Sequence, residues 1–305
     1  MRELLLNIIH NTVKEIIKIS PTSSDLIFRS FSINLPFITE ETYLHKHAFK
    51  NLLRLFGYAP SLRERGFLII VEWLINVDVE IQVDDVDDKS DAKSKQVFSP
   101  RSSDRQNSLS YKMDEIMMIL FEYLKEQMES IENRKVLFRI LQKAFEKFIM
   151  LTHRSKYTQF LIFYVCSYDP SFVERFVGRL VDWYCSEESP VLTRQTCCVY
   201  CASFICRANF ISIDIIRSVL YFSLTWINKY IDMYDVQENP LNPGDTGHLV
   251  FYSVMQAVCY ILCFTSKRFE QEKNGVQFLR SWDWTRILNS PLDPLRVGSV
   301  ESPDR

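Results

Sequence analysis

The residues best suited to chemistry are the cysteines, and all eight lie in the second half of the chain, within apolar text. The densest group is "CCVYCASFIC", where Cys198 and Cys201 have the spacing of a zinc half-site. Zinc needs four convergent ligands, whereas one continuous helix cannot turn Cys197, Cys198, Cys201 and Cys206 toward one point. We therefore predict that these cysteines are reduced, small core residues and that the chain holds no metal.

Two other pairs have ligand-like spacing. Cys259 and Cys263 stand four residues apart in another apolar stretch, where we predict the same core role. His45 and His47 would point to different faces of a helix, so a structural or surface role is predicted for them. The sequence carries none of the glycine-rich phosphate loops, nucleophile elbows or zinc-protease motifs of known enzymes. It therefore predicts a protein without catalytic activity and without a cofactor.

Serines offer a different chemistry in the segment "VDDVDDKSDAKSKQVFSPRSSDRQNS", residues 83–108. Ser99 precedes a proline, which suits a proline-directed kinase, and Ser102 and Ser103 precede an aspartate, which suits an acid-seeking one. A phosphate would add nearly two negative charges there. The hypothesis is a regulatory interaction loop that protein kinases modify, and the alternative is a solvated linker.

The same segment predicts a break in the fold. Residues 78–91 are rich in aspartate and glutamate with a single lysine, and the text then turns basic and serine-rich. Such a composition buries too little apolar area to offset the entropy lost on ordering. We therefore expect a disordered loop over residues 78–109, acidic first and then serine-rich.

Composition favours an all-α protein that binds other proteins. Only 7 of 305 residues are glycine, against a usual share of about 7%, which leaves few residues for hairpins or phosphate loops. The net charge of −2 provides no basic field for a nucleic-acid backbone, so direct specific DNA binding is not expected. The apolar stretch 248–264 is too short for a membrane span, and we predict a core helix there and no membrane association.

Apolar residues recur at helical spacing along almost the whole chain. The helices expected from this spacing are 2–19, 23–33, 40–57, 61–76, 111–131, 134–151, 155–167, 171–185, 190–208, 212–231, 248–265, 270–280 and 282–289. Most of them pair, with 35 to 45 residues in each pair, which is the size of a HEAT unit. The prediction is a single α-solenoid of HEAT-like antiparallel helix pairs over residues 1–305, with an inter-helix loop at 233–247 and a flexible tail at 290–305.

Helix starts are marked by hydroxyl or acidic residues beside proline. Asp169 is predicted to cap a helix that begins at Pro170, and Ser189 with Pro190 to do the same for the next helix. In "SPTSS", at the start of the second helix, either Ser23 or Ser24 is the expected cap.

Several stretches resemble the RNA polymerase I-specific transcription initiation factors of the TIF-IA family. They include "QFLIFYVCS", a helix opening with "RQ" that runs to "ASFICRANFI", and "FYSVMQAVCYILCF". The stretch "YAPSLRERGFLIIVEWLINVDVEI", followed at once by an acidic loop, is similar as well. The matches keep the family's order from about residue 5 to residue 296.

The resemblance implies a nuclear, nucleolar HEAT-repeat factor without catalytic activity. Such a factor binds RNA polymerase I on its stalk side and bridges it to promoter-bound core factor at ribosomal DNA. Family members carry a serine-rich patch whose charge controls polymerase binding, and the resemblance places part of it at Ser20, Thr22, Ser23 and Ser24. Periodicity alone gives the helical array, whereas the polymerase comes only from the resemblance.

The resemblance covers the middle of the family's pattern, so the chain is expected to be shortened at both ends. An α-solenoid scaffold or transport adaptor that lost polymerase binding through truncation is the alternative function. The sequence leaves self-association open.

Overall fold

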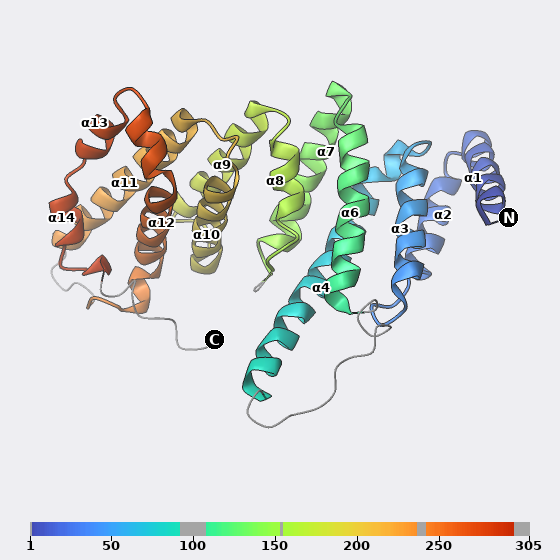
Figure 1. Ribbon diagram of the computed structural model, residues 1–305, viewed down its shortest axis with the longest axis horizontal. Coiled ribbons are helices and arrows are strands. Elements are labelled where there is room, and N and C mark those ends of the chain that lie inside the picture. The colour runs from blue at the N-terminus through green and yellow to red at the C-terminus, as the bar shows by residue number, and fades with distance from the viewer. Residues whose placement is uncertain (1, 92–107, 153–154, 237–241, 296–305) are drawn as a thin grey trace. The chain divides into compact units, whose positions relative to one another are not determined.

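The computed structural model describes the chain except for residues 1, 92–107, 153–154, 237–241 and 296–305, and for 82–91 it describes the backbone alone. The described residues form helices and turns and no β-strand. The chain divides into two compact units, Met1–Val165 and Cys166–Arg305. Each unit is built from consecutive antiparallel helices, so the predicted all-α class of HEAT-like helix pairs is confirmed (Figure 1).

The first unit contains the helices expected for its residues, in the expected order. Its elements are α1 (Arg2–Ile19), α2 (Ser23–Ile33), α3 (Thr42–Phe56), the 3-10 turn η1 (Pro60–Leu62), α4 (Arg63–Asp91), α6 (Leu109–Gln127), α7 (Ile131–Ala144), the π-helical turn η2 (Phe145–Ile149) and α8 (Phe160–Cys166), whose last residue falls in the second unit. Helix α4 packs against α3, α6 and α7. These contacts make α4 the central helix of this unit.

Helices α3 and α4 approach closely because α4 has a glycine where they meet. A Cβ atom at Gly66 would lie 2.2 Å from Cζ of Phe56, a distance that no packed atom pair tolerates. The ring of Phe56 occupies that space instead, and it stacks on Phe67 at 5.6 Å between ring centroids. Both rings are fully buried, so this pair forms the centre of the core of the first unit.

Helix α4 is longer than predicted, which corrects the start of the expected loop at residue 78. It continues to Asp91, so the chain from 78 to 91 is helical and not a loop. Val77 and Ile81 extend the apolar face of the helix, and the carboxylate of Asp78 is fully buried with hydrogen-bond partners from residues 155–158. The rest of the expected loop, 92–107, lies outside the described residues.

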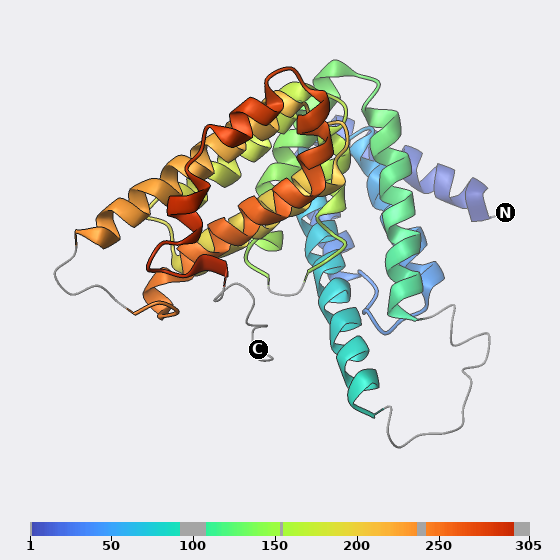
Figure 2. The same cartoon turned by 60° about the vertical axis from the view of Figure 1, so that its left-hand side comes forward.

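The second unit consists of α9 (Pro170–Cys185), α10 (Val191–Arg207), α11 (Ile213–Asp235), the 3-10 turn η3 (Thr246–His248), α12 (Leu249–Gln271), α13 (Gly275–Arg280) and α14 (Trp284–Leu288). Helices α9 and α10 form one pair, α11 and α12 the next (Figure 2). Helix α10 also runs parallel to α12, since Gln195 meets Ser253 at 3.2 Å and Cys206 meets the carbonyl of Tyr260 at 3.8 Å. Corresponding helices of two successive pairs are thus side by side, as in stacked helical repeats.

Helix caps follow the sequence in one case and not in another. The carboxylate of Asp169 accepts a hydrogen bond from the amide of Ser171 at 2.9 Å, with Pro170 in the first turn, so that cap is confirmed. The prediction for the next helix was wrong. Pro190 itself occupies the cap position of α10, and it has no side chain that could accept a hydrogen bond.

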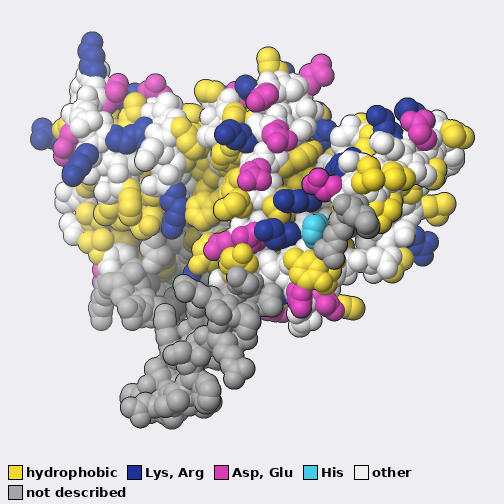
Figure 3. Space-filling model, turned by 45° about the vertical axis from the view of Figure 1, so that its right-hand side comes forward, with side chains coloured by type: hydrophobic (Ala, Val, Ile, Leu, Met, Phe, Trp, Pro, Cys, Tyr) yellow, Lys and Arg dark blue, Asp and Glu magenta, His cyan; other side chains and the backbone are white. Residues whose placement is uncertain are grey.

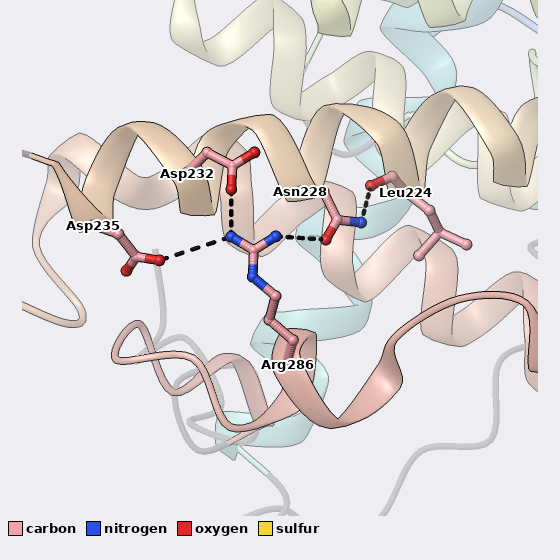
Figure 4. A network of polar contacts seen from close by, with 5 residues as sticks. All are labelled: Leu224, Asn228, Asp232, Asp235 and Arg286. Carbon is pink, nitrogen blue, oxygen red and sulfur yellow. Dashed lines mark hydrogen bonds and ion pairs between the residues drawn. The ribbon is translucent and has the colours of Figure 1, made fainter.

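Helix α11 ends at Asp235, so the first three residues of the loop predicted at 233–247 are helical. Arg286 of α14 explains the extension, because its guanidinium binds the carboxylate of Asp232 and lies 3.7 Å from that of Asp235 (Figure 4). The amide oxygen of Asn228 accepts a third contact from Arg286, at 3.4 Å. This network fastens α14 along the last turns of α11.

The segment expected to be a flexible tail begins inside the fold. Leu292 is fully buried, and its carbonyl accepts a hydrogen bond of 2.9 Å from the hydroxyl of Tyr252 in α12. The prediction of a flexible tail from residue 290 was therefore wrong for residues 290–292, because the apolar side chain of Leu292 belongs to the core. Residues 296–305 lie outside the described part of the chain.

The apolar stretch 248–264 lies in η3 and α12, as predicted for a helix with a buried face. Residues Thr246–Gln271 are long and apolar enough to cross a membrane by length and composition alone. In this structure, however, Phe251, Val258 and Ile261 are buried where α12 packs against α10 and α11. The packing is that of a core helix, a class that meets the same length and composition test.

Candidate protein-interaction surface

The predicted serine-rich site is the turn between α1 and α2, and the structure brings its four hydroxyl residues together. The hydroxyls of Ser20 and Thr22 lie 3.2 Å apart. Ser23 donates its hydroxyl to the carbonyl of Ser20 at 2.5 Å, and Ser24 donates to that of Pro21 at 2.7 Å. Ser20 and Thr22 are exposed, whereas Ser23 and Ser24 are half-buried.

The expected cap of α2 is wrong in detail. Thr22 occupies the cap position, and its side chain makes no capping hydrogen bond. Ser23 and Ser24 lie inside the first turn and bind carbonyls three residues back, so neither serves as the cap. The hydroxyl of Thr22 makes no capping hydrogen bond, so replacing this residue removes no capping bond from the start of α2.

Helix α2 presents an exposed apolar face that continues from this turn. Thr22, Leu26, Ser30 and Ile33 follow one another at three- and four-residue spacing and therefore lie on one side of the helix. Leu26 is 68% exposed, Ile33 is 72% exposed, and Phe37, just beyond the helix, is 81% exposed. Figure 3 turns the side of α1 to α3 forward and shows hydrophobic side chains exposed there among charged ones. We call the residues Thr22, Leu26, Ile33 and Phe37 the α2 face.

The opposite side of α2 is fixed to the first unit by Phe28. This ring is buried, and the guanidinium of Arg65 in α4 lies over it at 4.6 Å from the ring centroid. The same guanidinium binds the carboxylate of Asp25. A cation over a ring, held by a carboxylate, keeps α2 from rotating about its axis and so keeps the α2 face outward.

A buried lysine binds the loop between α2 and α3, residues 34–41, from inside the first unit. Lys112 of α6 is almost completely buried, and its ammonium group donates to the carbonyl oxygens of Ile38 and Glu40, the latter at 2.7 Å. Burial lowers the pKa of Lys112, and the charges of Glu80 and Glu40 oppose this shift. Two backbone carbonyls replace the water that the ammonium group loses.

His45 supports the same loop from α3. Its ring is fully buried, lies 5.0 Å from the ring of Trp73 between centroids, and meets the carbonyl of Glu41 through Nδ1 at 3.2 Å. Burial lowers the pKa of His45, the hydrogen bond to Glu41 raises it, and the charge of Lys112 lowers it. His45 is thus a core residue and His47 is exposed, which agrees with the structural or surface role predicted for the pair.

A loss of stability in mild acid is expected from His45. Its pKa lies below 6.5 in the folded chain, so below pH 6.5 the unfolded chain binds a proton that the folded chain does not. The free energy of unfolding therefore falls as the pH drops through this window, by at most about 1.4 kcal/mol per pH unit. Urea unfolding at pH 7.5 and 5.5 measures this, with His45→Gln as the comparison. An equal loss in both proteins would contradict the assignment to His45.

Helix α1 is joined to α3 by a second buried histidine. The ring nitrogens of His10 lie 2.8 Å from the hydroxyl of Tyr58 and 3.2 Å from the amide oxygen of Asn51. Burial lowers the pKa of His10, and the hydrogen bond to Asn51 opposes the shift. This contact sets the position of α1, and with it the position of the turn at 20–24.

The cysteines form no metal centre in the part of the chain that the structure describes, where no group of three or more His, Cys, Asp or Glu side chains could hold an ion. Cys166, Cys197, Cys198 and Cys201 are buried, as predicted for core residues. Burial raises the pKa of the Cys185 and Cys206 thiols to about 11. The core prediction was wrong for Cys263, which is exposed because it follows Cys259 onto the solvent side of α12.

The predicted phosphorylation sites Ser99, Ser102 and Ser103 lie outside the described residues, and they remain predictions. The residues that sequence reasoning missed are Phe37 and Lys112. Phe37 stands in "INLPFITEE", where the proline signals the end of a helix and the start of a loop, although nothing in the sequence marks the ring as exposed. Lys112 gave no signal, because its partners are carbonyls more than seventy residues earlier in the chain.

The chain resembles known proteins along nearly its whole length. Residues 1–301 match the family described as RNA polymerase I specific transcription initiation factor RRN3. The chain is 26% identical to RNA polymerase I-specific transcription initiation factor RRN3 of Mus musculus, over 94% of this chain and 48% of the relative. It is 25% identical to the rrn3 factor of Schizosaccharomyces pombe, over 95% of this chain and 55% of the relative.

A solved structure has the same fold. The crystal structure of RNA polymerase I transcription initiation factor Rrn3 superposes with a TM-score of 0.79 at 23% identity, covering 94% of this chain and 57% of that one. The chain therefore spans about half the length of the relatives that it matches. Since the family match extends from residue 1 to residue 301, the chain belongs to the RNA polymerase I specific transcription initiation factor RRN3 family.

Proposed function

We propose that this chain binds RNA polymerase I and helps bridge it to promoter-bound core factor at ribosomal DNA. The observation that carries the proposal is the family match over residues 1–301, since the matched relatives are named as RNA polymerase I-specific transcription initiation factors. Those relatives are initiation factors and not known enzymes, which fits a binding role. The site of action proposed with this function is the nucleus, and within it the nucleolus.

The polymerase contact proposed for this chain is the turn at Ser20, Thr22, Ser23 and Ser24 together with the α2 face. Two features support it. Exposed hydroxyls stand at one end of the face, and exposed apolar side chains, which protein interfaces bury at their centre, continue along it. In the proposed regulation, protein kinases act on this turn or on Ser99, Ser102 and Ser103, and the added charge weakens the contact.

The first test is a titration of the 305-residue chain against purified RNA polymerase I, with RNA polymerase II as the control. We expect selective, saturable binding to RNA polymerase I, with circular dichroism confirming a helical chain. A folded chain that binds neither polymerase would overturn the proposal and favour an α-solenoid scaffold or transport adaptor.

The turn is tested in the same titration by replacing Ser20, Thr22, Ser23 and Ser24 together with Asp. We expect at least roughly tenfold weaker binding, because like charges and unpaired carboxylates at an interface cost several kcal/mol. Asn at the same four positions is the matched control, since it has the shape of Asp without the charge. Equal affinities of the Asp and Asn variants would show that negative charge at this turn does not regulate binding.

A further inference from the structure

We propose that Phe37 is a pre-positioned aromatic anchor that inserts into an apolar pocket, bordered by basic side chains, on RNA polymerase I. This inference rests on the proposed function and adds a residue and a partner chemistry to it. Its basis is a contrast within one short loop. Phe37 is 81% exposed, yet carbonyls on its C-terminal side are held by the buried Lys112.

The loop is fixed by contacts that leave the Phe37 ring out. The carbonyl of Phe37 accepts the amide of Glu40 at 2.8 Å, which closes a turn. Lys112 then binds the carbonyls of Ile38 and Glu40 from inside the unit. The backbone on one side of Phe37 is therefore tied to α6, and Phe37 itself lies four residues after the end of α2.

Burying a lysine is costly unless its charge is satisfied, and here backbone carbonyls satisfy it. The arrangement holds the loop in a single conformation. An anchor on an ordered loop does not lose backbone entropy when a partner binds, which increases affinity without any added contact. Aromatic side chains that enter a pocket near the centre of an interface contribute most to binding energy.

The residues around Phe37 indicate the chemistry of the partner. Glu40 and Glu41 are exposed on the same loop, while Arg29 is the exposed cation on the neighbouring part of α2. Leu26 and Ile33 continue the apolar surface along α2 toward the turn at 20–24. The complementary surface is therefore an apolar pocket for the ring with Lys or Arg near the two carboxylates.

The test is the affinity of Phe37→Ala for purified RNA polymerase I. We expect the dissociation constant to rise at least roughly tenfold, as for an aromatic residue at the centre of an interface. The thermal midpoint should stay unchanged, because the ring touches little within the chain. Leu192→Ala is the matched control, since Leu192 is 70% exposed but lies on α10 of the second unit, and its affinity should equal that of the parent.

Lys112 is a positioning residue in this proposal, and a double-mutant cycle separates positioning from stability. Lys112→Met should weaken binding several-fold when Phe37 is present and have no further effect in the Phe37→Ala background. A purely structural role for Lys112 would instead lower the thermal midpoint and weaken binding by the same factor in both backgrounds.

The outcomes distinguish the anchor from the function itself. If the parent chain binds RNA polymerase I and Phe37→Ala binds equally well, the anchor is wrong and the proposed function stands. If the folded parent chain does not bind, both are overturned. Tenfold weaker binding of Phe37→Ala with an unchanged Leu192→Ala supports both.

Discussion

Replacing Asp78 with Ala is expected to lower the free energy of unfolding of the first unit by about 3 kcal/mol or more, because each buried donor that loses its acceptor costs about 1–3 kcal/mol. Its fully buried carboxylate accepts hydrogen bonds from the backbone amides of residues 156, 157 and 158 at 2.9 to 3.1 Å. The hydroxyls of Ser155 and Thr158 add bonds of 2.9 and 3.0 Å. Alanine would leave these donors without their acceptor.

Urea unfolding measures the loss, and hydrogen exchange locates it. The amides of Lys156, Tyr157 and Thr158 should exchange much faster in Asp78→Ala, because they lose the carboxylate that protects them. Glu72→Ala, on the exposed side of the same helix, is the control and should change the free energy of unfolding by less than about 0.5 kcal/mol. Equal losses in the two variants would mean that the buried carboxylate contributes no more than surface charge.

The second large effect is expected in the other unit, from Phe204→Ala. Phe204 is fully buried in α10, and its ring meets that of Phe176 in α9 edge to face at 5.3 Å between centroids. Removing the ring leaves a cavity that the helices cannot close, which costs about 3–5 kcal/mol. The predicted result is a lower free energy of unfolding of the second unit, measured by urea unfolding with hydrogen exchange across α9 and α10.

Val199→Ala is the matched control, because Val199 lies on the same helix but is 64% exposed. It should cost less than about 0.5 kcal/mol. If both variants lose the same amount, the loss does not come from the aromatic contact with α9.

Local pattern was enough for nearly every helix, because apolar residues that recur at helical spacing favour an amphipathic helix. The first helix was predicted at 2–19 and is observed at Arg2–Ile19, and the second was predicted at 23–33 and is observed at Ser23–Ile33. Asp169 was a correct cap because a cap bond joins residues two or three positions apart. Such short-range physics is fully present in the sequence.

Apart from the two wrong helix caps, the errors occur where a residue's partner is distant in the chain. The composition of the acidic run from residue 78 predicted a solvated segment. Its first carboxylate, that of Asp78, instead accepts hydrogen bonds from backbone amides 78 to 80 residues later. The ordering of the loop at 34–41 was missed for the same reason, since Lys112, which binds its carbonyls, lies more than seventy residues later in the chain. Composition indicates whether a segment can remain solvated. It cannot show that a distant segment will replace water as the hydrogen-bond partner of a charged group.

The candidate surface divides in the same way. The turn at Ser20, Thr22, Ser23 and Ser24 came from a family resemblance, and its hydroxyl contacts could not be derived from composition. The exposed Leu26 and Ile33 were read only as parts of a helix, because periodicity identifies apolar positions without showing which of them a neighbouring helix covers. Only the packed arrangement separates the covered apolar side chains from the uncovered ones.

The contact between Asp78 and residues 155–158 also has a consequence for synthesis on the ribosome. A carboxylate whose last hydrogen-bond donor lies 80 residues later in the chain has only water as its partner until that later segment leaves the exit tunnel. At usual elongation rates this takes roughly 4–16 s. During that interval the middle of α4 carries a hydrated charge beside its apolar side chains, so the helix cannot be buried in its final form. Completion of the first unit is therefore timed by translation of residues 155–158, which precede α8.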